Sequence, residues 1–202
     1  MSINFPDIIP NTMSFGIKYS TQINISPLSG SVQTIEVPGA RWVASMTYSG
    51  MSVAEGRELA GFIADLRGSG GRFFLYDFSH PEPRGSNSFP SAVTLNGNYG
   101  VGVTSIATIG WTASAAGVLL VGDYIELPNK ELKIVTSIVN ALPGGDALIE
   151  FEPPLRNGVA TSDPVNTSQC RTTMLLDNDE YRWQANNAGL LTDSTITCME
   201  GF

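Results

Sequence analysis

The sequence has few charged residues and few cations, and each scarcity excludes a class of protein. Only 15% of the 202 residues are charged and 42% are hydrophobic, whereas disordered chains combine few apolar residues with many like charges. The 11 Lys and Arg against 19 Asp and Glu give a net charge of -8, which argues against a surface that tracks nucleic-acid phosphates. No hydrophobic run approaches the roughly 18 to 20 residues that span a bilayer, so no membrane partner is expected.

Cysteine is equally scarce, because Cys170 and Cys198 are the only two. Two cysteines do not make a disulfide framework, and we interpret them as free thiols in the core, although they could pair. The N-terminal residues lack the basic and apolar regions of a signal peptide. We therefore expect the protein to be made and kept in a reducing cytoplasm, or to be exported only as part of something larger.

Turn-forming residues are abundant, with 21 Gly and 12 Pro, and this composition favours a mainly β fold. One helix is predicted over residues 52–67. Ser52 and Glu55 have the spacing of a capping box, and Gly68 is expected to supply the left-handed cap. The apolar side chains at helical spacing form one stripe, as expected for a helix laid on a sheet: Leu59, Phe62, Ile63 and Leu66.

Strand patterns divide the chain into two domains. Residues 41–48 alternate, with Trp42 and Tyr48 on the same face. Residues 72–78 hold an aromatic run with continuous hydrophobic side chains at 73–76, which predicts a strand buried on both faces. Prolines and a glycine at 81–85 then indicate a boundary. Between 87 and 166, short strand patterns recur with turns between them, which predicts a small β-barrel or sandwich.

The acidity lies mostly in the later part of the chain. The net charge is -1 for residues 1–86, -4 for 87–166 and -3 for 167–202.

Residues able to perform catalysis are hard to find. His80 is the only histidine and lies in a proline-rich loop, and no Gly-x-Ser-x-Gly motif accompanies it. Glu150 and Glu152 share a strand face. A solvated pair of carboxylates is a simpler interpretation of them than the catalytic pair of a hydrolase. The acidic turn at 177–180 lacks the glycine and distal Glu of a calcium loop. We expect no catalytic, cofactor-binding or metal-binding residues and no enzyme activity.

Two aromatic residues are candidates for contact with a partner. Trp111 lies among small residues in a predicted loop, where a large aromatic side chain can anchor an interaction. Tyr99 lies in a glycine-rich loop nearby in sequence. Together they suggest an alternative function as a carbohydrate-binding β module that attaches to a host surface.

Several motifs follow one another in an order that resembles a known protein family. The motifs are WVASMTY at 42–48, FIADLRG at 62–68, RFFLYD at 72–77, PRG at 83–85, VGDYIEL at 121–127, IEFEPPLR at 149–156 and CRT at 170–172. In this order they are similar to the minor or distal tail proteins of long-tailed, siphovirus-like bacteriophages. The resemblance covers roughly residues 40–183.

The resemblance implies an architecture and a set of partners. Residues 1–86 and 167–202 would form a tail-tube-like β-sandwich with the helix at about 52–67, and residues 87–166 an inserted β-barrel. The protein would be a structural virion component, made in the host cytoplasm. It would form a ring of copies, commonly a hexamer, that joins the tail tube protein to the tail hub, tip or baseplate proteins.

DNA would pass through the lumen of this ring without specific binding. We expect some of the surplus carboxylates to face the lumen, because they repel phosphates over a Debye length of about 8 to 10 Å. A hydrolase that uses Glu150 or Glu152 is the least favoured alternative.

Overall fold

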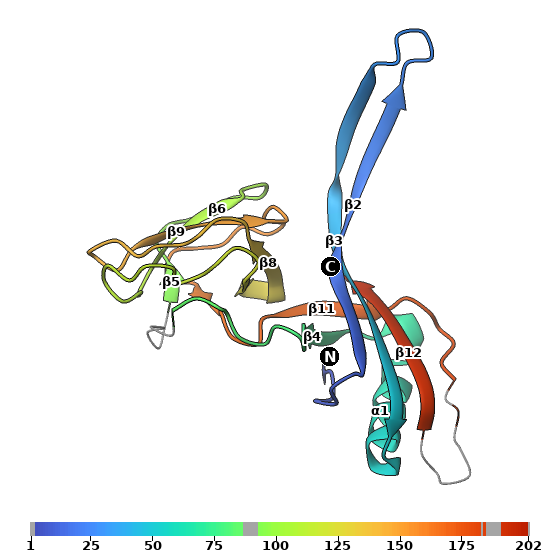
Figure 1. The fold of residues 1–202 in the computed structure, drawn as a ribbon. Coiled ribbons are helices and arrows are strands. Elements are labelled where there is room, and N and C mark those ends of the chain that lie inside the picture. Colours follow the sequence, from blue (N-terminus) through green and yellow to red (C-terminus); the bar gives the residue numbers. More distant parts are fainter. Residues whose placement is uncertain (1–2, 87–92, 183, 185–190, 202) are drawn as a thin grey trace. The chain divides into compact units, whose positions relative to one another are not determined.

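The computed structural model describes residues 3–86, 93–182, 184 and 191–201. The chain forms two compact units, one from Met1–Phe73 with Met174–Phe202 and one from Phe74–Thr173. The second unit is therefore inserted into the first along the sequence. The described residues hold one α-helix and two six-stranded sheets, which confirms the predicted mainly β fold with one helix (Figure 1).

One sheet has the strand order β1-β4-β11-β12-β3-β2, so its neighbours come from both ends of the chain. The strands are β1 (Ile3–Asn4), β2 (Thr12–Ile25), β3 (Val32–Met51), β4 (Phe73–Tyr76), β11 (Arg171–Leu176) and β12 (Leu191–Glu200). The central pairs β11–β12, β12–β3 and β3–β2 are antiparallel.

The helix α1 spans Val53–Leu66 and begins with the predicted capping box. The Ser52 hydroxyl accepts the Glu55 N–H at 3.3 Å, and the Glu55 carboxylate accepts the Ser52 N–H at 2.9 Å. The helix ends at Arg67, whose φ of 53° is left-handed, and Gly68 follows with a φ of 74°. The left-handed turn thus includes Arg67 as well as the expected Gly68, and continues into the 3-10 turn η1 (Gly68–Gly70).

The core of the first unit lies on one face of the sheet, as the alternation predicted. Trp42, Met46 and Tyr48 on β3 are at most 1% exposed. On the same unit the rings of Phe5, Phe62 and Phe73 meet, with centroids 5.1 to 5.7 Å apart. These contacts join the N-terminal segment, α1 and the start of β4.

The β4 strand differs from its prediction. Phe73 and Leu75 are fully buried, whereas Phe74 and Tyr76 are only partly buried. The strand therefore alternates and does not bury both faces equally. A continuous apolar run misleads here because aromatic residues also cover half-exposed faces.

The sheet of the second unit has the strand order β10-β5-β6-β9-β8-β7. Its strands are β5 (Val93–Leu95), β6 (Ser105–Ile109), β7 (Tyr124–Leu127), β8 (Glu131–Val135), β9 (Ala147–Glu152) and β10 (Pro164–Val165), and η2 (Pro128–Lys130) joins β7 to β8. Glu126 on β7 and Asn166 beside β10 exchange backbone hydrogen bonds of 2.8 and 2.9 Å. This bridge joins the two ends of the sheet, so the unit is nearly barrel-shaped around a hydrophobic core.

The turn at 79–86, which the sequence suggested as a boundary, belongs to the second unit. The Arg84 N–H and side chain both bind the buried carboxylate of Asp123, at 3.1 and 3.3 Å. The Gln169 N–H donates to the Pro81 carbonyl at 2.6 Å. These bonds fix the turn to residues beyond 120. The chain passes from the first unit to the second between Phe73 and Phe74, and back between Thr173 and Met174.

Candidate functional site

The hairpin of β2 and β3 extends far beyond the strand that flanks it. β12 pairs with β3 only from Val43 to Met51, whereas β2 pairs with β3 as far as Ile25 and Val32. Residues 20–37 therefore form a two-stranded projection, which we call the arm; it is the long hairpin in blue in Figure 1. A two-stranded hairpin is at best marginally stable alone in water.

The base of the arm is marked by a bulge. The register shifts between Lys18 and Ser20, so residues 38–40 of β3 lie opposite Tyr19 alone. Gly39 has a φ of 140°, a positive angle that glycine adopts readily because it has no Cβ. Such a bulge bends the ladder and increases its twist, and it separates the arm from the part of β3 that covers the core.

The arm exposes large hydrophobic side chains over its whole length. Six of them are between 44% and 99% exposed: Ile23, Ile25, Leu28, Val32, Ile35 and Val37. Single apolar residues on a surface are normal, but a contiguous group on one element marks an interaction surface. Nothing in the sequence suggested this surface, because residues 20–31 mix polar, apolar and turn-forming types.

The two faces of the arm differ in chemistry. Cross-strand partners share a face, so the register assigns each residue. One face continues the core side of the sheet and carries the pairs Thr21/Glu36, Ile23/Thr34 and Ile25/Val32; we call it the core-side face. The opposite face carries Ser20/Val37, Gln22/Ile35 and Asn24/Gln33; we call it the groove face.

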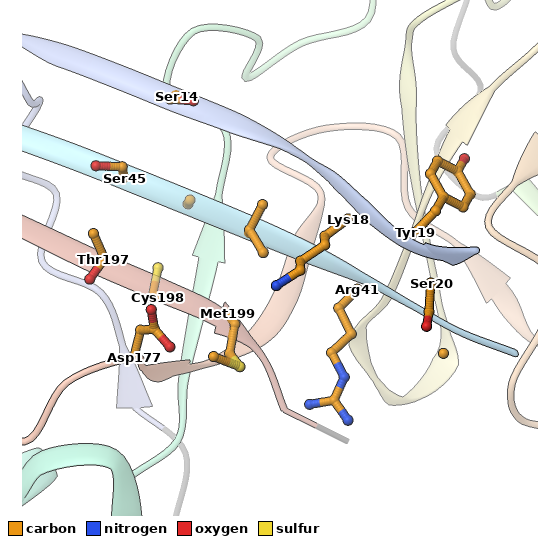
Figure 2. Close-up of a pocket in the computed structure, with 13 residues that line it drawn as sticks. Ser14, Lys18, Tyr19, Ser20, Arg41, Ser45, Asp177, Thr197, Cys198 and Met199 are labelled. Carbon is orange, nitrogen blue, oxygen red and sulfur yellow. The ribbon is translucent and has the colours of Figure 1, made fainter. Parts of the chain in front are cut away.

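At the base of the arm the groove face opens into a hollow of about 700 Å³ (Figure 2). Hydroxyl groups and two cations line much of it, and the lining includes Ser14, Lys18, Ser20, Arg41, Ser45 and Thr197. Asp177 lies beside Cys198 in this hollow (Figure 2). Burial, together with the Asp177 carboxylate, raises the pKa of the Cys198 thiol to about 12.

Two positive charges face each other in this hollow. Lys18 on β2 is the direct cross-strand partner of Arg41 on β3, and both side chains project to the same side of the ladder (Figure 2). Like charges directly opposite each other destabilise a sheet. A local violation of this kind in an otherwise consistent fold is typical of a functional position.

The two aromatic residues proposed from the sequence as contact anchors belong to the barrel core. Trp111 is 5% exposed, and its indole N–H donates to the Thr108 hydroxyl at 2.8 Å. Tyr99 packs against the same core and its hydroxyl accepts the Ala107 N–H at 2.8 Å. The expectation of an exposed Trp111 is therefore wrong, because the surrounding small residues let the loop close over the indole.

The lone histidine has a buried acidic partner. The Asp77 carboxylate lies 3.1 Å from His80 Nδ1 and accepts the Tyr124 hydroxyl at 3.2 Å. Burial, reinforced by Asp77, raises the pKa of Tyr124. The cavity beside His80 has a volume of only about 10 Å³, which is about the space of one water molecule. This arrangement holds a loop together and has no room for a substrate.

Buried carboxylates in the second unit are a feature that sequence reasoning missed. Four acids are 7% exposed or less: Asp77, Asp123, Glu126 and Glu131. Each binds backbone N–H groups or side chains of loops; for example, Glu126 accepts the Arg171 N–H at 2.7 Å. These four carboxylates fix the barrel loops and do not contribute to a charged surface, so they cannot be among the carboxylates expected in a lumen.

The remaining sequence candidates occupy structural positions. Glu150 is exposed and Glu152 is partly buried, on the outward face of β9. Asp179 accepts the Ser69 N–H and hydroxyl at 2.8 and 2.5 Å, and these bonds lower the pKa of Asp179. Cys170 and Cys198 are free and buried, as expected.

Other kinds of site were sought over the described ranges. In residues 3–86, 93–182, 184 and 191–201, no three His, Cys, Asp or Glu side chains gather as metal ligands. In the same ranges, α1 is too short and too polar to cross a membrane.

The chain was also compared with known proteins. No protein-family model and no curated sequence matches it. Its function must therefore be argued from its residues and their arrangement, and the arm with the hollow at its base is the most distinctive surface.

Proposed function

We propose that this chain is a structural protein of a bacteriophage tail that assembles with copies of itself into a ring. The observation that carries the proposal is the arm, a two-stranded element with six exposed hydrophobic side chains. An isolated hairpin of this kind gains stability when another surface covers it. A ring of identical subunits supplies such a surface to every copy at once.

The size of the arm suits this role. Residues 20–37 amount to 18 residues, close to the roughly 20 to 30 that each partner contributes to a standard-sized protein interface. Between Lys18 and Arg41 the arm carries a single charge, Glu36. A charge-poor arm is well suited to contact between copies of a chain whose net charge is -8, because it adds little to their mutual repulsion.

The place of the ring in the virion is proposed from the family resemblance. The motifs from residue 42 to residue 172 are similar to those of distal tail proteins, which implies a ring, commonly of six copies, at the distal end of the tail. There it joins the tail tube protein to the hub, tip or baseplate proteins, and DNA passes through its lumen without specific binding. The protein is made in the host cytoplasm and ends in the tail of the virion.

The alternative, a carbohydrate-binding module, loses its main support. A sugar-stacking platform needs exposed aromatic faces, whereas Trp111 is buried and the Tyr99 hydroxyl is held by a backbone amide. A hydrolase is not supported either, because Glu150 and Glu152 lie on an outward strand face.

The proposal is tested by electron microscopy of the purified full chain over a range of concentrations. We expect closed rings with an open centre and no retention of duplex DNA in a mobility-shift experiment. A protein that stays monomeric at every concentration, or that binds DNA tightly, would contradict the proposal. The gene order gives an independent test, because a tail protein of this kind should lie beside a tape-measure gene.

A further inference from the structure

The arm has opposite charges on its opposite faces. Lys18 and Arg41 lie on the groove face at its base, and Glu36 lies on the core-side face. Glu36 is also the only charged residue among residues 19–40. Within this pair of strands, one face therefore carries the two cations and the other carries the one carboxylate. Asp177, which lies outside the two strands, also lines the hollow beside the cations.

These charges are not neutralised by each other within one copy. Over the described residues, no hydrogen bond or ion pair holds the Lys18 ammonium or the Glu36 carboxylate. Both side chains are exposed. Because Lys18 and Glu36 point to opposite sides of the ladder, they cannot meet without a second molecule.

We propose that Glu36 of one copy binds the Lys18–Arg41 pair of the next copy, with the core-side face of one arm stacked on the groove face of the other. This proposal rests on the self-association in the proposed function and names the contact that produces it. A positive face on a negative face is a heterologous, head-to-tail contact. Repeated around an axis, such a contact closes into a ring where the rotation between neighbours closes, and it gives an open filament where it does not.

The apolar residues of the arm fit the same stacking. Ile23, Ile25 and Val32 lie on the face of Glu36, and Ile35 and Val37 lie on the face of Lys18 and Arg41. Stacking one face on the other buries both groups together, while the ion pair fixes the relative position.

The register sets the offset between neighbouring copies. Glu36 pairs with Thr21, which is three residues from Lys18 along β2. At about 3.3 Å per residue this is about 10 Å. Neighbouring arms would therefore be displaced along their length by about 10 Å, so that the hollow at the base of one arm receives the middle of the next.

A second copy is a better occupant than an unrelated anion. Phosphate groups of a nucleic acid would approach a chain with a net charge of -8, which repels them. A free carboxylate or phosphate ion would neutralise the cations but would leave the apolar residues of both faces exposed. A surface that carries both a carboxylate and apolar side chains matches both features of the groove face, and the core-side face is such a surface.

Charge reversal of the full chain tests the contact. Glu36→Lys alone, or Lys18→Glu with Arg41→Glu, should raise the dissociation constant of self-association at least about 30-fold. Combining all three substitutions should bring it back to within about tenfold of the wild type. Sedimentation at low ionic strength gives the constants, since salt screens exposed charges.

Crosslinking gives a second measurement, which reports the proximity of the two residues in the assembled protein. A chain with Glu36→Cys, mixed with a chain with Lys18→Cys, should form a mixed dimer with a short bismaleimide. The matched control is Gln33→Cys with Lys18→Cys, because Gln33 lies on the groove face and should give no mixed dimer. Cys170 and Cys198 are buried and do not interfere.

The outcomes separate the two proposals. If the wild type forms rings but charge reversal has no effect and residues 36 and 18 do not crosslink, the Glu36 contact is wrong and the proposed function stands. If the wild type stays monomeric at all concentrations, both are overturned. Weakening by each reversal, with recovery in the combined variant, supports the contact.

Discussion

The Lys133 ammonium lies 2.8 Å from a carboxylate oxygen of Glu131 inside the second unit, and both side chains are at most 3% exposed. The ammonium also donates to the Pro154 carbonyl at 2.8 Å. The Glu131 carboxylate accepts the Arg156 N–H at 2.6 Å. This buried pair ties β8 to the loop after β9, and its polar groups satisfy one another.

Loss of Lys133 should therefore be severe. Lys133→Ala leaves the Glu131 carboxylate buried without its counter-ion, and we expect a loss of about 3 to 5 kcal/mol in unfolding free energy. Arg182→Ala is the control, because both side chains of the Arg182–Glu180 ion pair are exposed, and such a pair contributes about 1 kcal/mol or less. Urea unfolding measures both, and equal effects would refute this account of the barrel.

The helix cap gives a second prediction. Ser52→Ala removes the acceptor for the Glu55 N–H, and we expect it to lower the unfolding free energy by about 1 kcal/mol. Thermal unfolding followed by circular dichroism measures the change. A substitution with no effect would mean that the capping box does not stabilise α1.

The same cap predicts a pH dependence. Hydrogen bonds from the Ser52 side chain and N–H lower the pKa of Glu55 below its ordinary value of 4.5. Because the folded-state pKa is the lower one, the stabilisation is present above pH 4.5 and is lost as the pH falls through the folded-state pKa. The stability difference between the wild type and Glu55→Gln should therefore shrink on acidification. A difference that stayed constant down to pH 2 would exclude this cause.

Trp111 should act on stability and not on binding. Trp111→Ala empties a buried site and breaks the bond to Thr108, so we expect a loss of about 3 to 5 kcal/mol. Leu148→Ala is the control, because Leu148 is 57% exposed, and its effect should lie within about 0.5 kcal/mol. A stable Trp111 variant that lost binding on a glycan array would instead favour the carbohydrate-binding module.

The thiols should be unreactive in the folded protein. Burial raises the pKa of Cys170 as well as that of Cys198, so little thiolate exists at pH 8. A disulfide-exchange reagent should modify both residues rapidly in guanidinium chloride and only slowly without it. Rapid modification of the native protein would show that one thiol is accessible.

The sequence was informative where side-chain pattern and local chemistry agree. The capping box predicted α1 almost to the residue, and the alternation of Trp42 to Tyr48 predicted the buried face of β3. The short apolar patterns from residue 93 onward predicted several strands of the second unit, among them β5, β8 and β9. In each case a few neighbouring residues determine the structure.

The features that sequence reasoning missed depend on partners distant along the chain. The pattern of residues 32–37 alternates loosely and indicates a strand, but the length of the arm follows from cross-strand pairing between Thr12–Ile25 and Val32–Met51. The burial of Glu131 depends on Lys133 and on backbone groups after residue 153. Trp111 was misjudged because small neighbours in sequence do not reveal the core that encloses the indole.

Removal of the arm tests the central claim most directly. Ser20 and Val37 are cross-strand partners, so an Asn-Gly turn in place of residues 21–36 can join them as a two-residue hairpin loop. Light scattering should find rings for the wild type and monomers for the shortened chain, with melting temperatures within a few degrees of each other. A shortened chain that folds and still forms the wild-type ring would contradict assembly through the arm.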